Sequence, residues 1–162
     1  MMFKRTYILR GFTLIELLVT LSLLALILTS AAPVMQLTVK RDKEQELKRS
    51  LWQIRDAIDA YKRAVDEGFI KKTPGQSGYP ASLRTLVEGV ENKRDPNKQK
   101  IYFLRSIPRD PFSTDLDISA EQTWRKRSYA SSFDEPKEGD DIYDVYSSSQ
   151  DIGLNERPYR EW

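Results

Sequence analysis

A long apolar segment near the amino terminus constrains this chain more than any other feature. Residues 11–39 form a run of 29 residues in which Glu16 is the only charge. As an α-helix this run would be about 43 Å long, whereas the hydrocarbon core of a bilayer is roughly 30 Å thick. The sequence therefore predicts a helix at residues 12–35 that is long enough to cross a membrane.

Three interpretations of this segment compete. A secretory signal peptide would be cleaved near residues 29–31, but its apolar centre normally has only roughly 7 to 15 residues. A signal anchor would hold a folded domain on the membrane, and Lys4, Arg5 and Arg10 fit a cytoplasmic amino terminus. The third interpretation is a membrane helix that also assembles with other helices.

Glu16 favours the third interpretation. An ionised side chain inside a membrane helix costs on the order of 2.5 to 3.5 kcal/mol and is usually paired. The apolar run contains no Lys or Arg, but cleavage after Gly11 would give Phe12 a free amine. A neighbouring copy of the chain could present that amine to Glu16.

The sequence from Arg10 to Glu16, Arg-Gly-Phe-Thr-Leu-Ile-Glu, resembles the leader junction of type IV pilins and type II secretion pseudopilins. The resemblance implies that a prepilin peptidase cleaves between Gly11 and Phe12, and that the Phe12 amine is then methylated. It also implies that Glu16 neutralises the amine of an adjacent subunit and sets the register of assembly. Pro33 matches a proline of the family, and we expect it to kink or locally melt the helix because it lacks a backbone donor.

The same resemblance divides the chain into three parts. These are a leader at residues 1–11, a transmembrane and assembly helix at 12–35, and a periplasmic globular domain at 36–162 that includes the second half of the long helix. It implies a single-pass protein of the bacterial inner membrane. The implied partners are other copies of the chain, minor pseudopilins, the inner-membrane assembly platform and prepilin peptidase.

The composition argues against an enzyme and against nucleic-acid binding. The chain has no His and no Cys, which excludes triads and dyads built on these residues, the usual zinc sites and iron–sulfur clusters. Beyond Met35, 23 basic residues balance 23 acidic ones, so the basic patch that nucleic acid requires is missing. We therefore predict a structural function.

A second helical pattern follows the apolar segment. Apolar residues recur at steps of three and four from Leu47 to Val65, and Gly68 is a natural end for the helix. This stripe could form a coiled-coil seam, but a single helix packed across a small sheet is the simpler prediction. Glu44 and Lys48 are spaced to form an ion pair on the exposed side.

The remaining sequence predicts short elements and loops. A short helix is expected at residues 82–90, with Ser82 as its cap. Residues 101–104 suit a short strand or a packed turn. Residues 123–132 and 141–148 are rich in β-branched and aromatic side chains and are expected to form a β-hairpin.

Two stretches of the head resemble the major pseudopilin. Residues 107–112, Ile-Pro-Arg-Asp-Pro-Phe, resemble its Leu-Pro-x-Asp-Pro-aromatic motif, and we expect Asp110 to hold a turn there. Residues 143–147, Tyr-Asp-Val-Tyr-Ser, resemble the sequence that precedes its calcium loop. The resemblance thus raises the question of whether the following residues bind calcium.

The residues that follow offer few oxygen ligands for calcium. Within residues 148–162 the only aspartate is Asp151, and Glu156 could add a second carboxylate. Calcium prefers six to eight oxygen ligands, and Arg157 and Arg160 would oppose a cation. We expect no cofactor, with calcium at Asp151 as the alternative.

These features predict an α+β, pilin-like fold in which a long amino-terminal helix packs on a small antiparallel β-sheet, and Trp162 packs the tail onto the head. The function implied by the resemblance is that of a structural subunit of a type II secretion pseudopilus, a periplasmic filament that assembles helically from the inner membrane and drives protein secretion. Two alternatives remain open: a type IV pilin for motility, adhesion or DNA uptake, and a signal-anchored periplasmic binding module. The lack of Cys favours the pseudopilin over the pilin, because many such pilins close a carboxy-terminal loop with a disulfide.

Overall fold

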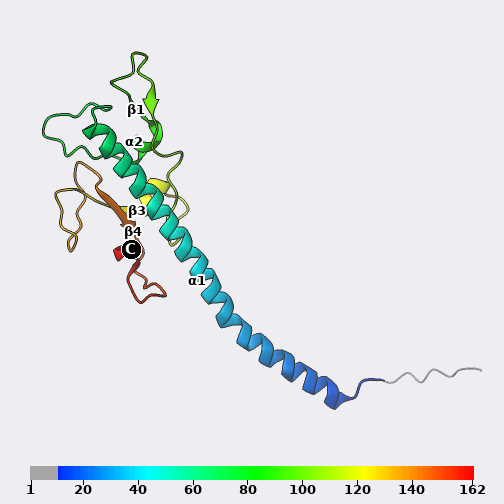
Figure 1. Ribbon diagram of the computed structural model, residues 1–162. Helices are drawn as coiled ribbons and strands as arrows, with labels where there is room; N and C mark the ends of the chain where they lie inside the picture. Colours follow the sequence, from blue (N-terminus) through cyan, green and yellow to red (C-terminus); the bar gives the residue numbers. More distant parts are fainter. Residues whose placement is uncertain (1–10) are drawn as a thin grey trace, which may run out of the picture. The chain divides into compact units, whose positions relative to one another are not determined.

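The structure is a computed structural model that describes the backbone of residues 11–162 and the side chains of these residues except 30–34. Contacts divide the chain into two compact units, Met1–Val39 and Lys40–Trp162, and we call the second unit the head. The elements labelled in Figure 1 are, in chain order, α1 (Leu14–Asp66), α2 (Leu83–Glu88), β1 (Val90–Glu91), β2 (Lys100–Ile101), η1 (Ala120–Thr123), β3 (Trp124–Arg127), β4 (Asp144–Ser147) and η2 (Tyr159–Glu161).

Helix α1 ends where the sequence predicted. Gly68 has a φ of 77°, a left-handed conformation that glycine adopts without a steric penalty. The amide of Phe69 donates to the Ala64 carbonyl at 2.9 Å, and the amide of Gly68 donates to the Val65 carbonyl at 3.0 Å. This pair of bonds is the Schellman motif, which satisfies carbonyls that the end of a helix leaves open.

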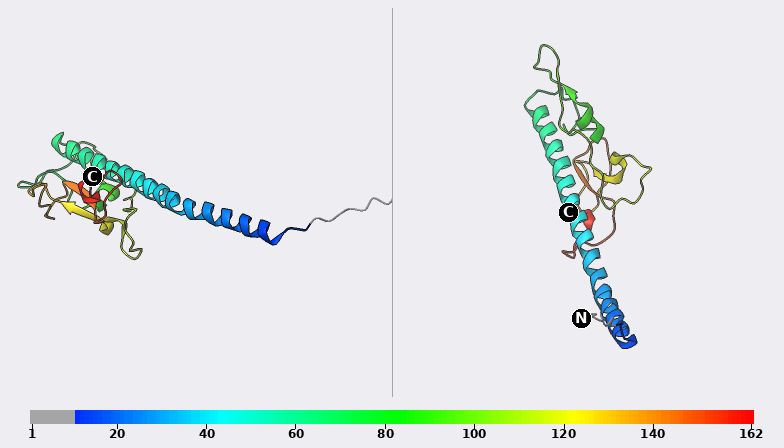
Figure 2. Two further views of the ribbon diagram at one scale, coloured as in Figure 1. Left: turned by 90° about the horizontal axis from the view of Figure 1, so that it is seen from below. Right: turned by 90° about the vertical axis from the view of Figure 1, so that its right-hand side faces the viewer.

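The apolar stripe of α1 forms one side of the core of the head. Leu47, Leu51, Ile54 and Ile58 are at most 1% exposed. The buried residues that pack with them are Leu83 and Leu86 of α2, Leu104, Trp124 of β3, Ile142, Val145 of β4 and Tyr159 of η2. Both views in Figure 2 show these elements along the part of α1 that belongs to the head. The stripe is therefore buried within one chain, as the prediction of a helix packed across a sheet requires, and no coiled-coil seam is left exposed.

Helix α2 is followed by two short paired strands. The Ser82 side chain caps α2 by accepting a hydrogen bond from the Thr85 amide at 3.3 Å, as predicted. Strand β1 pairs antiparallel with β2, with Val90 opposite Ile101. A short strand or a packed turn was expected at residues 101–104. Strand β2 ends at Ile101, and the amides of Phe103 and Leu104 then both donate to the Leu86 carbonyl.

The predicted β-hairpin is present but shorter than expected. Strands β3 and β4 pair antiparallel, with Trp124 opposite Ser147 and Arg127 opposite Asp144. The predicted strand at residues 123–132 begins one residue later, because Thr123 ends η1, and it stops at Arg127, because the Ser128 amide donates to a loop carbonyl at Lys137. Among the described residues, the named strands form two separate two-stranded antiparallel sheets, and the predicted α+β class, with a long amino-terminal helix, is confirmed.

Candidate assembly site

The predicted cleavage junction lies just before α1. Gly11, Phe12 and Thr13 are outside the helix, and Phe12 is 81% exposed. A Cβ atom added to Gly11 would meet nothing within 4 Å, so no described part of the chain requires glycine at this position. The basic residues Lys4, Arg5 and Arg10 lie outside the described residues.

Thr13 caps the amino terminus of α1. Its hydroxyl accepts a hydrogen bond from the Glu16 amide at 3.3 Å, and its carbonyl accepts one from the Leu17 amide at 3.1 Å. The spacing Thr13-x-x-Glu16 is that of a capping box, and an acidic side chain in the first turn also interacts favourably with the helix dipole. The sequence carried this signal, but Glu16 was interpreted there only through its charge.

Polar groups in the apolar part of α1 are satisfied within the helix, except at Glu16. The hydroxyl of Thr20 donates to the Leu17 carbonyl at 2.9 Å, and that of Ser22 donates to the Leu18 carbonyl at 2.8 Å. Within the described residues, the exposed Glu16 carboxylate has no hydrogen bond or ion pair. This single charge is therefore available to a partner.

The first half of α1 presents its large apolar side chains to the outside. Those from residue 12 to residue 28 are all between 51% and 81% exposed: Phe12, Leu14, Ile15, Leu17, Leu18, Val19, Leu21, Leu23, Leu24, Leu26, Ile27 and Leu28. A continuous apolar surface of this kind marks contact with protein or lipid. Among the described residues, no helix combines the length and the hydropathy needed to cross a membrane.

The predicted membrane segment and Pro33 are described only in part. Position 33 lies among residues 30–34, whose side chains are outside the described residues. Helix α1 is assigned without a break from Leu14 to Asp66, so the helix does not melt at Pro33. The kink expected there stays a prediction.

Asp110 holds a turn, as predicted, and also joins that turn to the hairpin. The side chain is 2% exposed, and its Oδ1 accepts a hydrogen bond from the Phe112 amide at 2.9 Å. Its Oδ2 accepts hydrogen bonds from the Ser147 hydroxyl at 2.6 Å and from the Ser148 amide at 3.2 Å. The second role was not predicted, because the sequence does not show that residues 110 and 147 meet.

The ion pair predicted between Glu44 and Lys48 on the exposed side is wrong. Glu44 is only 8% exposed, and its Oε1 accepts hydrogen bonds from the Leu154 amide at 2.7 Å and from the Tyr159 hydroxyl at 2.9 Å. Burial raises the pKa of the Tyr159 hydroxyl, and the hydrogen bond to Glu44 raises it further. A signal for this role was available, because Glu44 precedes Leu47 by three residues and so continues the buried stripe.

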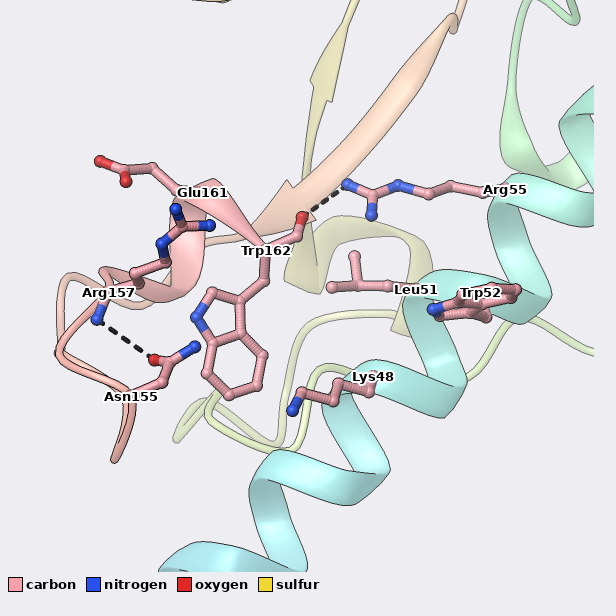
Figure 3. Close-up of a pocket in the computed structure, with 8 residues that line it drawn as sticks. All are labelled: Lys48, Leu51, Trp52, Arg55, Asn155, Arg157, Glu161 and Trp162. Atoms are coloured by element: carbon pink, nitrogen blue, oxygen red, sulfur yellow. Dashed lines mark hydrogen bonds between the residues drawn. The ribbon is translucent and has the colours of Figure 1, made fainter.

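The end of the chain packs against α1 around a pocket of about 300 Å³. Figure 3 shows Arg55 reaching from α1 to the Trp162 carbonyl, with which it forms a hydrogen bond of 2.7 Å. The same guanidinium bonds the Asp144 carboxylate at 2.8 Å. The ammonium of Lys48 lies 4.6 Å from the centre of the Trp162 ring, a cation–π contact. Trp162 thus packs the tail onto the head, as predicted.

Several oxygens of the tail that could bind a cation accept hydrogen bonds from the chain itself. The carbonyl of Asp151 accepts a hydrogen bond from the Tyr159 amide, and that of Gly153 accepts one from the Glu156 amide. The side-chain oxygen of Asn155 accepts one from a backbone amide. In the part of the chain that the structure describes, no group of three or more acidic, His or Cys side chains could hold a metal. Asp151, the residue at which calcium was expected as the alternative, is exposed.

Comparison with known proteins identifies the amino-terminal segment. Residues 10–32 match the prokaryotic N-terminal methylation motif, and this range contains Gly11, Phe12 and Glu16. No curated protein and no solved structure matches the chain significantly. The motif is that of structural, membrane-anchored subunits that prepilin peptidase processes and that assemble into filaments. The chain therefore carries the amino-terminal signal of a pilin-like subunit.

Proposed function

We propose that the chain is a structural subunit of a type II secretion pseudopilus. Prepilin peptidase removes residues 1–11, and the mature protein begins at a methylated Phe12. Before assembly, copies lie in the inner membrane with the head in the periplasm. An inner-membrane assembly platform then adds them, together with minor pseudopilins, to a helical filament. The chain itself catalyses no reaction and binds no nucleic acid.

The observation that carries this proposal is the unpartnered carboxylate of Glu16 on an exposed apolar helix. A charge that leaves water for an apolar environment needs a partner, because the desolvation cost is otherwise too large. Cleavage after Gly11 creates a positive charge at Phe12, four residues before Glu16. Pairing between copies would therefore neutralise both charges and fix the axial step of one helix against the next.

The apolar side chains have a matching role in the proposed cycle. In the membrane they contact lipid, and in the filament they contact the same faces of neighbouring helices. Because lipid and packed helices are similarly apolar, moving a subunit from one to the other requires little desolvation of these side chains. The pairing of Glu16 then decides which axial position is preferred.

The mature amino terminus tests the proposal most directly. Protein is purified from the native host and from a strain that lacks prepilin peptidase, and both samples are analysed by intact and peptide mass spectrometry. We expect a methylated Phe12 in the first sample and an unprocessed leader in the second. An intact Met1 or Met2 in the native host would point to a signal-anchored module, and an end near residue 31 would point to a secreted domain; either result overturns the proposal.

A second experiment separates a pseudopilus from a type IV pilus. The gene is deleted, and the secreted proteins, surface filaments, twitching motility and DNA uptake of the mutant are compared with those of the parent. The resemblance of residues 107–112 and 143–147 to the major pseudopilin supports an effect on secretion alone. Normal secretion with a loss of motility, adhesion or DNA uptake would instead assign the chain to a type IV pilus.

A further inference from the structure

We propose that three side chains of α1 close the carboxy-terminal tail, residues 148–162, in the place of a metal ion, so that the head is stable without calcium. The three side chains are Lys40, Glu44 and Arg55, and we call them the tail clasp. The inference rests on the contacts of the head, and it stands whether or not the chain assembles into a pseudopilus.

Lys40 supplies the positive charge of the clasp. Its ammonium donates a hydrogen bond of 2.7 Å to the carbonyl of Ile152, 112 residues further along the chain. That carbonyl lies where the tail reverses direction, because Ile152 bridges Pro158 and the Gly153 amide donates to the Arg157 carbonyl at 2.8 Å. The Lys40 ammonium thus binds a backbone oxygen of the kind that calcium uses as a ligand.

Glu44 supplies the negative charge, one helical turn after Lys40. One of its oxygens binds both the Leu154 amide and the Tyr159 hydroxyl. In a calcium site a carboxylate of this kind would contribute an oxygen to the metal. Here the carboxylate binds donors of the tail directly, while Lys40 binds an acceptor, so the two side chains satisfy both kinds of backbone group in the tail.

Arg55 fastens the far end of the tail. It lies 15 residues after Lys40, which corresponds to about 22 Å along the helix. Its guanidinium bonds the Asp144 carboxylate, the Val145 carbonyl and the Trp162 carbonyl. The clasp therefore holds the tail at its turn and at Trp162, and Arg55 also ties Trp162 to strand β4.

The inside of the tail is filled by a side chain. A Cβ atom added to Gly153 would lie 2.5 Å from the ring of Trp162 and 2.7 Å from the Asn155 side-chain oxygen. The ring of Trp162 also packs edge-on against Tyr159, with 5.1 Å between ring centres. The tail is thus ordered by an aromatic ring that fills its interior, which is a second and independent reason for its stability without a metal.

The first test adds and removes the metal. The full-length chain in detergent is unfolded by heat in excess calcium chloride and in excess EGTA, and hydrogen–deuterium exchange of the tail is measured under both conditions. We expect the same unfolding temperature and the same exchange rates in the two buffers. Slower exchange of residues 148–162 or a higher unfolding temperature in calcium, lost in Asp151→Asn, would overturn the inference.

The second test breaks the clasp and compares it with matched controls. In Glu44→Gln a neutral amide oxygen replaces the charged acceptor of two hydrogen bonds and binds both donors more weakly, so tail exchange should accelerate about tenfold or more. Glu46→Gln removes an exposed carboxylate from the same helix and should leave exchange unchanged. Equal exchange in these two variants would overturn the clasp.

A further pair of variants keeps the test decisive if Glu44→Gln does not fold. Lys40→Met retains the apolar stem of the side chain but removes the ammonium, and Arg41→Met does the same at an exposed neighbour. Faster exchange near Ile152 in Lys40→Met alone supports the clasp. Unchanged exchange in Lys40→Met contradicts it.

Discussion

The hydroxyl of Tyr159 donates a hydrogen bond of 2.9 Å to the carboxylate of Glu44, which lies 115 residues earlier in the chain. Tyr159 is fully buried, and its ring stacks on Phe112 with 4.1 Å between ring centres. This contact joins helix α1, the turn at residues 110–113 and the tail. The stability of the head therefore depends on a hydrogen bond between residues at opposite ends of its sequence.

Replacing Tyr159 by Phe should weaken the head and change its response to alkali. The lost hydrogen bond to a charged group should lower the free energy of unfolding by about 1.5–3 kcal/mol at neutral pH. The folded pKa of Tyr159 is raised above its unfolded value of 10.0, so the stability that this group contributes is fully present below that pH and is lost above it.

Urea unfolding of the full-length chain, measured from neutral pH to about pH 11, checks this prediction. The difference between wild type and Tyr159→Phe should shrink as the pH rises above 10.0. Tyr61 and Tyr79 also have raised pKa values, but they are present in both proteins and cancel. A difference that is constant across this range would contradict the assigned role of the Tyr159 hydroxyl.

Replacing Asp110 by Asn should destabilise the head without touching the assembly helix. The buried carboxylate accepts three hydrogen bonds with its two oxygens, and in asparagine an NH2 group would replace one of these oxygens and face a donor. We expect a loss of about 2–4 kcal/mol in the free energy of unfolding, measured by urea titration. Asp117→Asn, at an exposed position, is the control and should change stability by less than about 0.5 kcal/mol.

Replacing Glu16 by Gln should remove the charge of this side chain and leave the helix cap intact. The cap is made by the Thr13 hydroxyl and the backbone amide of residue 16, which the substitution leaves in place, so α1 should keep its start, while pairing with the amine of Phe12 is lost. We expect normal processing and membrane levels but no filaments, as judged by electron microscopy and by cross-linking between copies.

Thr13→Ala is the matched variant for Glu16→Gln. It removes the hydroxyl that accepts from the Glu16 amide and leaves the charge in place, at a cost of about 0.5–2 kcal/mol to the helix start. Filaments should persist in this variant. Abundant filaments in Glu16→Gln, or their loss in both variants alike, would show that the charge is not what controls assembly.

Replacing Gly11 by Val should block processing and leave the fold intact. The structure has free space around this position, so the side chain has nothing to clash with inside the described chain. Mass spectrometry should find the leader still attached, while the unfolding temperature of the head equals that of the wild type. A mature product that still begins at Phe12 would contradict the prediction.

The parts of the fold that the sequence predicted are those set by local patterns. The stripe that begins at Leu47 fixed which face of α1 is buried, Gly68 marked its end, and Ser82 marked the start of α2. Each of these signals lies within a few residues of the structure it determines. The hairpin was found for the same reason, although its strands were predicted too long because loop hydrogen bonds replace the ladder after Arg127.

The parts that the sequence did not predict depend on contacts between distant residues. The spacing of Glu44 from Leu47 places it on the buried face of α1, whereas its charge suggested an exposed position. The structure shows that donors of the tail, the Leu154 amide and the Tyr159 hydroxyl, bind its carboxylate there. The additional bonds from Asp110 to the end of β4 are of the same kind. Of the candidate site, the junction at Gly11 and Phe12 and the charge at Glu16 were predicted, whereas the clasp required the path of residues 148–162.

The back-bonded hydroxyl groups of Thr20 and Ser22 have a mechanical consequence. Because each hydroxyl proton is already committed to a carbonyl of its own helix, neither side chain has a proton to offer an adjacent helix. In a bundle of such helices, axial sliding of one helix past another would break no hydrogen bond from these groups. It would be opposed mainly by the packing of the aliphatic side chains. In the proposed filament, the pairing of the Glu16 carboxylate would then be the main interaction in residues 12–29 that favours one axial position of a helix over another.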